Sequence, residues 1–153
     1  MSRRDEIRMS DEEVAAFLAE QKTVICATLG PNGRPHLMPL WYVRDGDELC
    51  GWTFAKSQKA KNLERDPRAT LEVEDGVEYH ELRGVMLECD VHVERETERV
   101  AEEYGFPLLE RYAGGSYEAR EAFRQQAKKR IGLRFTPTKV VSWDHSKLGQ
   151  GVY

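Results

Sequence analysis

The sequence predicts one small α+β domain, mainly β, in which about seven antiparallel strands close into a barrel or a sandwich. With 153 residues, the chain is long enough for a single domain that buries its own core. Short segments of alternating apolar residues recur along it, and Gly-rich turns separate them. No internal repeat or linker divides the sequence, so we expect one domain over residues 1–153. Closure removes the exposed edges of such a sheet.

Capping and stop signals mark the predicted helices. Ser10 and Glu13 have the spacing of a capping box, and apolar residues follow them at helical intervals. Ser57 is a suitable N-cap for a second helix, which Asp66-Pro67 ends because a residue before proline disfavours the helical region. The predicted helical segments are 10–21, 57–66 and 96–130, the last broken around 105–107 and 114–115.

Turn signals separate the predicted strands. Gly30-Pro31-Asn32-Gly33, Asp45-Gly46 and Asp75-Gly76 are all typical of tight turns. The first two join three strands into a meander. The clearest strand places Val85, Leu87, Cys89, Val91 and Val93 on one face. The predicted strands are 23–29, 36–44, 49–54, 68–74, 85–93, 131–135 and 139–143.

Composition and charge exclude several classes of protein. The net charge of -4 argues against nucleic acid as the main partner, which favours a strongly basic surface. The charged N-terminus leads into no apolar run, so we expect neither a signal peptide nor a membrane span. Cys26, Cys50 and Cys89 are odd in number and widely spaced, which favours a reduced, cytoplasmic protein.

The start of the helix predicted at 57–66 is the most informative segment for function. A helix N-terminus offers unpaired N–H groups and partial positive charge, and Lys56, Lys59 and Lys61 flank it here together with Ser57 and Asn62. One interpretation is a cradle for a cofactor phosphate or a carboxylate-rich tail. The other is an ordinary capped helix with a solvated lysine face. Under both interpretations we expect the Lys59 side chain to be exposed and the Lys61 side chain to point away from the cradle.

Two aromatic segments could line a pocket. Pro39 removes a hydrogen bond from the strand 36–44, so this strand belongs at an edge or a bulge. Beside it, Trp41 and Tyr42 could face a flat heteroaromatic ring or could simply pack at a barrel rim. Near the C-terminus, Trp143 could cover a pocket, cross a dimer interface or close the core.

No familiar catalytic constellation is present. His36, His80, His92 and His145 show no metal-ligand spacing, and no nucleophile elbow, P-loop or dinucleotide fingerprint occurs. Tyr79-His80-Glu81 could serve in acid–base chemistry, but such a group on a loop is usually surface. If the protein is an enzyme, a cofactor therefore carries the reaction and the chain supplies binding and orientation.

Taken in order, these segments resemble a known family. The order is a helix, a strand, a G-P-N-G-R-P turn, a strand with P-L-W-Y, a D-G turn, a strand, K-S-Q-K-A-x-N-L-x-x-D-P and an alternating strand. It is similar to the pyridoxamine 5'-phosphate oxidase-like split β-barrel superfamily, and most of all to its F420-dependent deazaflavin oxidoreductases. The resemblance extends to S-W-D-H-x-K-L-G at 142–149. It implies a six- to seven-stranded antiparallel split β-barrel with short helices.

The resemblance also implies where a cofactor binds. The phosphate-holding role falls on Lys56, Ser57 and Lys59, and less surely on Asn62. The ring-facing positions are Met38, Pro39, Leu40, Trp41 and Thr53, while Tyr79 and Trp143 are candidates to reach across from a second subunit. The family works as a homodimer with two cofactor sites between its subunits. The arginine-rich FMN phosphate pattern of true pyridoxamine phosphate oxidases is not visible here.

The implied function is hydride transfer between coenzyme F420 and an electron-poor small-molecule substrate. Two alternatives stay open: an FMN-dependent oxidoreductase on the same fold, and a non-enzymatic carrier of flavin, deazaflavin or haem. The apolar face of strand 85–93 beside the late aromatic segment leads us to expect an extensive subunit interface.

Overall fold

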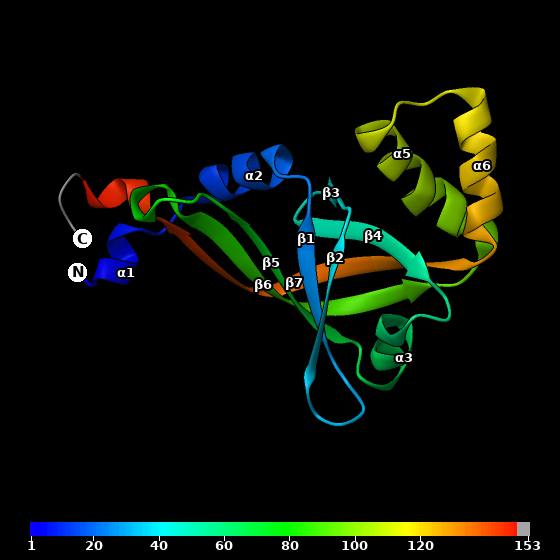
Figure 1. The fold of residues 1–153 in the computed structure, drawn as a ribbon, viewed down its shortest axis with the longest axis horizontal. Coiled ribbons are helices and arrows are strands. Elements are labelled where there is room, and N and C mark those ends of the chain that lie inside the picture. The colour runs from blue at the N-terminus through cyan, green and yellow to red at the C-terminus, as the bar shows by residue number, and fades with distance from the viewer. Residues whose placement is uncertain (150–153) are drawn as a thin grey trace.

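The computed structural model describes residues 1–149, which form one seven-stranded antiparallel sheet flanked by short helices (Figure 1). Along the sheet the strands run in the order β2-β1-β5-β6-β7-β4-β3. The strands are β1 (Val24–Leu29), β2 (Pro35–Leu40), β3 (Val43–Asp45), β4 (Glu48–Phe54), β5 (Arg68–Asp75), β6 (Arg83–Glu94) and β7 (Arg130–Asp144). The α-helices are α1 (Arg3–Glu6), α2 (Asp11–Glu20), α3 (Gln58–Arg65), α4 (Thr97–Arg99), α5 (Phe106–Tyr112) and α6 (Tyr117–Ala127).

Both hairpins of the predicted meander form, but its middle strand is not continuous. Strand 36–44 is two strands, because the chain leaves β2 at Trp41 and re-forms as β3, which pairs with β4 instead of with β1. β2 and β3 are therefore the two edges of the sheet, although only Trp41 and Tyr42 separate them in sequence. This short link brings the edges together and closes the sheet on itself. Pro39 lies in the edge strand, as the sequence predicts.

The last two predicted strands are one strand. β7 runs without interruption from Arg130 to Asp144 and pairs with β6 along nearly its whole length. The sequence predicts that the first of these strands ends before Pro137, because proline has no N–H to donate to the ladder. The structure accommodates that proline opposite Cys89, where the register between the two strands shifts. β6 and β7 therefore form a long antiparallel pair at the centre of the sheet order (Figure 1).

The two capped helices form as predicted. Ser10 and Glu13 make a reciprocal capping box at α2, and the Ser57 hydroxyl accepts from the Ala60 N–H at α3. In the predicted helical segment 96–130, the structure differs from the prediction at the first of the two expected breaks. Around Gly105 the chain does not break but makes a π-helical turn, η2 (Val100–Gly105). The Trp52 ring occupies the space where a side chain at 105 would point, which favours glycine there.

Three short elements complete the fold. The helix α1 is not predicted from the sequence, and Ser2 and Asp5 form its capping box. The Asp75-Gly76 turn leads into the 3₁₀ helix η1 (Tyr79–Glu81) before β6 begins. A second 3₁₀ helix, η3 (His145–Leu148), follows β7. Among residues 1–149, no helix is both long enough and apolar enough to cross a membrane.

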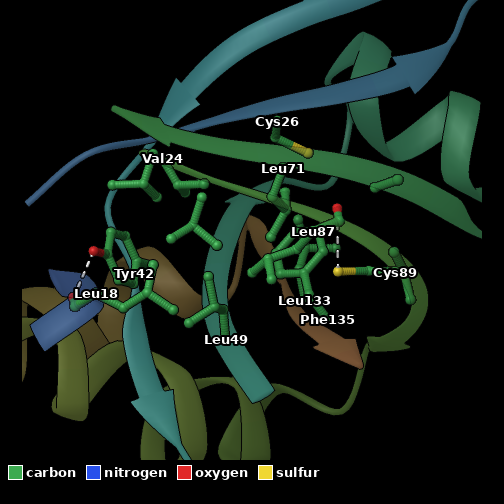
Figure 2. Close-up of a cluster of buried hydrophobic side chains, with 14 of the residues drawn as sticks. Leu18, Val24, Cys26, Tyr42, Leu49, Leu71, Leu87, Cys89, Leu133 and Phe135 are labelled. Carbon is green, nitrogen blue, oxygen red and sulfur yellow. Dashed lines mark hydrogen bonds between the residues drawn. The ribbon is translucent and has the colours of Figure 1, made fainter. Parts of the chain in front are cut away.

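The core lies inside the barrel and also receives α2 (Figure 2). Tyr42 is fully buried there, and its hydroxyl donates to the Leu18 carbonyl over 2.6 Å, which fixes α2 against the link between β2 and β3. Val85, Leu87, Cys89 and Val91 all belong to this core. The chain buries this face within its own barrel, so it does not supply the surface for the expected subunit interface, and the dimer itself stays a prediction.

Candidate functional site

The start of α3 lies where β4 ends (Figure 1). Thr53, near the end of β4, is buried, and its hydroxyl lies 3.4 Å from that of Ser57, the N-cap of α3. In the described part of the chain, the N–H groups of Gln58 and Lys59 reach no acceptor. First-turn N–H groups of a helix are left free in this way and attract anions. We call Thr53, Ser57, Lys59 and these two N–H groups the α3 cradle.

Lys59 is not the exposed lysine that the sequence predicts. Only 5% of its surface is accessible, and its Nζ donates to Thr53 Oγ1 over 3.4 Å, a long hydrogen bond. No carboxylate within residues 1–149 forms an ion pair with it. Because α3 packs against β1 and β4, a side chain on its inner face points into the barrel mouth. A buried ammonium with one weak partner is costly, so an anion would be strongly favoured here.

The electrostatics of the cradle follow from this burial. Loss of water lowers the pKa of the Lys59 ammonium, and the nearby Cys26 thiol offsets only part of that effect. Burial likewise raises the pKa of the Cys26 thiol to about 11. The thiols of Cys50 and Cys89 are buried as well, with pKa values raised to about 11 and about 12. Such thiols stay protonated and are poor nucleophiles.

Asn62 holds α3 against the sheet. The residue has no exposed surface. Its amide nitrogen donates to Thr28 Oγ1 over 3.0 Å, and its amide oxygen accepts from Gln58 over 2.8 Å. Both ends of the amide are thus bound within the protein, which gives Asn62 a positioning role. Direct contact between Asn62 and a cofactor stays a prediction.

Lys56 and Lys61 are both exposed, unlike Lys59. Lys56 precedes the N-cap and therefore lies at the entrance of the cradle. Lys61 lies on the solvent side of α3, as the sequence predicts.

The inner face of β2 continues from the cradle. Met38 and His36 pair with Cys26 and Thr28 across the β1–β2 ladder, so their side chains lie on the same face as these two residues. Met38 is 47% exposed, and His36 Nδ1 is buried without a hydrogen-bond partner. This edge is an open, largely apolar shelf beside a cationic cradle, an arrangement that suits a flat ring attached to an anionic chain.

The rest of the predicted ring-facing segment lies around the end of β2. Pro39 is exposed, Leu40 is half-buried, and Trp41 is 51% exposed. The Trp41 ring stacks on Tyr112 of α5 at 4.4 Å between centroids. Trp41 therefore covers neither the core nor the cradle in this structure, but has a fixed position next to α5.

Trp143, near the end of β7, and Tyr79, in η1 just before β6, lie at the opposite end of the β6–β7 pair from the cradle. Trp143 pairs with Gly84 at that end, whereas Gly132 pairs with Glu94 beside β4. Ten residues of strand separate these pairs, which is roughly 30 Å. Trp143 is half-buried against Gly84, where a Cβ would lie 2.3 Å from its ring. The Tyr79 ring packs on His145 at 4.6 Å. Within one subunit these two residues cannot share a ligand with the α3 cradle.

The structure also groups residues that sequence reasoning missed. On the outer face of β4, Arg130 lies over Trp52 and Phe54, next to Phe123 of α6. The alternation of Trp52 and Phe54 in a predicted strand could have indicated an outer aromatic face. Their neighbours come from distant parts of the chain, and no local pattern predicts that contact.

Comparison with known proteins places this fold. No curated protein matches the chain. A solved structure of a conserved hypothetical protein from Mycobacterium tuberculosis shares 40% identity, covering 100% of this chain and 96% of that one, with a TM-score of 0.89. An F420 reductase structure shares 21% identity over 86% of this chain and 98% of its own, with a TM-score of 0.69. A haem storage protein from Vibrio cholerae shares 17% identity over 89% and 97%, with a TM-score of 0.71.

At such low identity, the last two structures show a common fold and nothing finer.

Within residues 1–149, no group of three or more His, Cys, Asp or Glu side chains is placed to hold a metal ion. The sequence model of one family, pyridoxamine 5'-phosphate oxidase, matches residues 10–144, which include every strand and the α3 cradle. The chain belongs to the pyridoxamine 5'-phosphate oxidase family.

Proposed function

We propose that this protein is an F420-dependent oxidoreductase that transfers a hydride between the deazaflavin and an electron-poor small molecule. The observation that carries the proposal is the buried Lys59 ammonium, which has no counter-charge in the described chain and lies beside free N–H groups of α3. A phosphate group would supply both a negative charge for Lys59 and acceptor oxygens for these N–H groups.

The residues present fit such a cofactor. Lys59, Ser57 and the first turn of α3 would hold its phosphodiester, and Lys56 at the entrance suits the carboxylates of its tail. The shelf formed by Met38 and the end of β2 would receive the flat ring. When bound, a reduced deazaflavin supplies a hydride from its ring. The chain's part is to orient ring and substrate and to limit water at the cradle.

FMN and a carrier role are the alternatives to this proposal. FMN also presents a phosphate, so the cradle alone does not separate the two cofactors. One structural neighbour is an F420 reductase and another a haem storage protein, which makes binding without turnover a real alternative. The absence of an arginine cluster at the cradle favours F420 over FMN, because FMN ends in a doubly charged phosphate.

A homodimer is part of the proposal. Several large apolar side chains are exposed, with Leu37 at 56% and Met38, Trp41 and Phe54 close to half exposed. Leu37, Met38 and Trp41 follow one another along the edge strand β2 and the link after it, and exposed apolar groups of this size are typical of an interaction surface. A second copy would also bring its Tyr79 and Trp143 end to a cradle that one subunit leaves without them. Sedimentation at micromolar concentration should give about twice 17.6 kDa, and Leu37→Glu should shift the protein to monomer. A monomeric wild type would remove the shared-site proposal.

Titration of the purified protein with F420 and with FMN tests the cofactor. Lys59→Ala should weaken F420 binding by roughly ten- to a hundredfold, because a charge-assisted bond to a buried anion is worth about 1.5–3 kcal/mol. Lys61→Ala, two residues along on the exposed side, should bind like wild type. Ring fluorescence reports both affinities, and substrate reduction by F420 separates an enzyme from a carrier. Equal F420 affinity in Lys59→Ala and wild type at low salt would sink the proposal.

A further inference from the structure

Arg130 lies on the outer face of the barrel, away from the α3 cradle. It is the first residue of β7 and pairs with Phe54 of β4, so the two side chains lie on the same side of the sheet. Thr53 and the cradle are on the other side. The guanidinium is 4.1 Å from the centre of the Phe54 ring and 4.7 Å from that of Trp52.

The guanidinium of Arg130 has no acceptor. Its Nε is buried without a hydrogen bond, and no ion pair or hydrogen bond to its side chain occurs anywhere in residues 1–149. Burial lowers the pKa of Arg130, yet an arginine keeps its charge in proteins. A half-buried cation that rests on ring faces and has no acceptor within the described chain keeps the N–H donors at the end of its guanidinium for a ligand.

These donors face a cavity of about 380 Å³, within the range of ~300–1,000 Å³ typical of ligand pockets. Its lining combines flat rings with polar groups, which are the Gln126 amide and the Arg130 guanidinium. Trp52 is held rigidly, since it stacks on Phe123 at 5.1 Å and its ring fills the space beside Gly105. Residues lining the cavity include Pro39, Trp41, Trp52, Phe123, Gln126 and Arg130.

We propose that this cavity binds a planar, conjugated carboxylate, with Arg130 receiving the carboxylate and the aromatic side chains receiving the flat body. A guanidinium pairs with a carboxylate through two parallel hydrogen bonds, and aromatic walls favour a flat apolar group. The inference rests on the proposed function, for which it names the substrate class. Pro39 and Trp41 belong to both the cavity and the predicted ring-facing segment, so a substrate held here would lie at the end of β2, across that strand from Met38.

A carboxylate at Arg130 could also come from the glutamate tail of the cofactor. Rigid aromatic walls offer little to such a flexible, polar chain, which is why we favour a conjugated acid. The experiment therefore uses three probes on protein free of F420: trans-cinnamate, its neutral analogue trans-cinnamamide, and N-acetylglutamate as a flexible carboxylate. Calorimetric titration at low salt gives the three dissociation constants.

We expect cinnamate to bind at least tenfold more tightly than cinnamamide or N-acetylglutamate. Arg130→Gln should remove that preference, and Arg130→Lys should keep only part of it, because a lysine lacks the planar fork. Lys129→Gln removes the same charge from an exposed neighbour and should bind cinnamate like wild type. Phe123→Leu should weaken cinnamate more than N-acetylglutamate.

Unchanged cinnamate affinity in Arg130→Gln, or equal binding of acid and amide by wild type, would overturn the inference. N-acetylglutamate binding as tightly as cinnamate would overturn it in favour of the cofactor tail. If Arg130→Gln fails to fold, Arg130→Lys decides between these outcomes. Lys59→Ala should leave cinnamate binding intact, so a failure of F420 binding at the α3 cradle is recognised separately.

Discussion

Two arginines, one on either side of α6 in the sequence, rest on aromatic rings in the same way but differ in what their N–H groups reach. Arg111 lies 4.6 Å from the Tyr42 ring, and Arg130 lies 4.7 Å from the Trp52 ring. Neither forms an ion pair with a carboxylate in the described chain. Arg111 nevertheless donates to the carbonyls of Ala19, Gln21 and Tyr42, whereas Arg130 donates to none.

This difference separates cations that stabilise the fold from cations that can serve a ligand. The carbonyls around Arg111 belong to the C-terminal end of α2 and to the link that closes the barrel, and a helix leaves such carbonyls without partners. Arg111 therefore connects α5 with the end of α2 and with the link between β2 and β3, and its N–H donors find acceptors there. Arg130 and Lys59 have the opposite balance, because within residues 1–149 Arg130 reaches no acceptor and Lys59 reaches only the Thr53 hydroxyl over 3.4 Å, which does not offset the cost of burial.

The largest effect expected from this comparison is on Arg111. Arg111→Gln should lower the free energy of unfolding by about 2–4 kcal/mol, since several carbonyls, most of them partly buried, lose a charged donor at once. Arg130→Gln, which makes a comparable change of charge over a similar ring, should change it by less than about 1 kcal/mol. Urea unfolding followed by circular dichroism gives both values. Equal losses in the two variants would mean that Arg130 is as structural as Arg111.

The sequence predicts the local elements of the barrel well and its closure poorly. The capping box at Ser10 and the cap at Ser57 are chemical patterns within four residues, and both form. The link at Trp41 and Tyr42 is different, because its path depends on where the buried Tyr42 ring finds α2. A pattern of alternation cannot distinguish two strands that pair with each other from two strands at opposite edges.

The same limit applies to the candidate site. Lysines at a helix N-terminus indicate an anion cradle, and that position is local in sequence. Which of these lysines is buried depends on how α3 packs on β1, through Asn62 and Thr28. The Arg130 cavity needs β2, β4, α6 and β7 together, so it has no sequence signature of its own.

A smaller effect is expected at the α3 cradle in the absence of cofactor. Lys59→Met should raise the free energy of unfolding by about 1 kcal/mol, because it replaces a buried charge by an apolar chain of similar length. Lys61→Met removes the same charge from an exposed position and should stay within about 0.5 kcal/mol of wild type. Loss of the Lys59 charge should therefore weaken cofactor binding but raise stability, whereas loss of the Arg111 charge should lower stability.

The dependence of this stability difference on pH sharpens the prediction. Since burial lowers the pKa of Lys59 below its ordinary value of 10.5, the unfolded chain binds this proton more tightly than the folded chain. As the pH falls from 10.5 through the lowered pKa, wild type therefore loses stability that Lys59→Met keeps. The advantage of Lys59→Met should be largest at neutral pH and should shrink as the pH rises toward 10.5. Burial raises the pKa of Cys26 from 9.0 to about 11, so this thiol lowers the stability of wild type and Lys59→Met alike as the pH rises above 9, and the comparison of the two proteins removes most of its contribution. A stability difference that stays constant with pH would mean that Lys59 is well solvated in the folded chain, and the contrast with Arg111 would then rest on Arg130 alone.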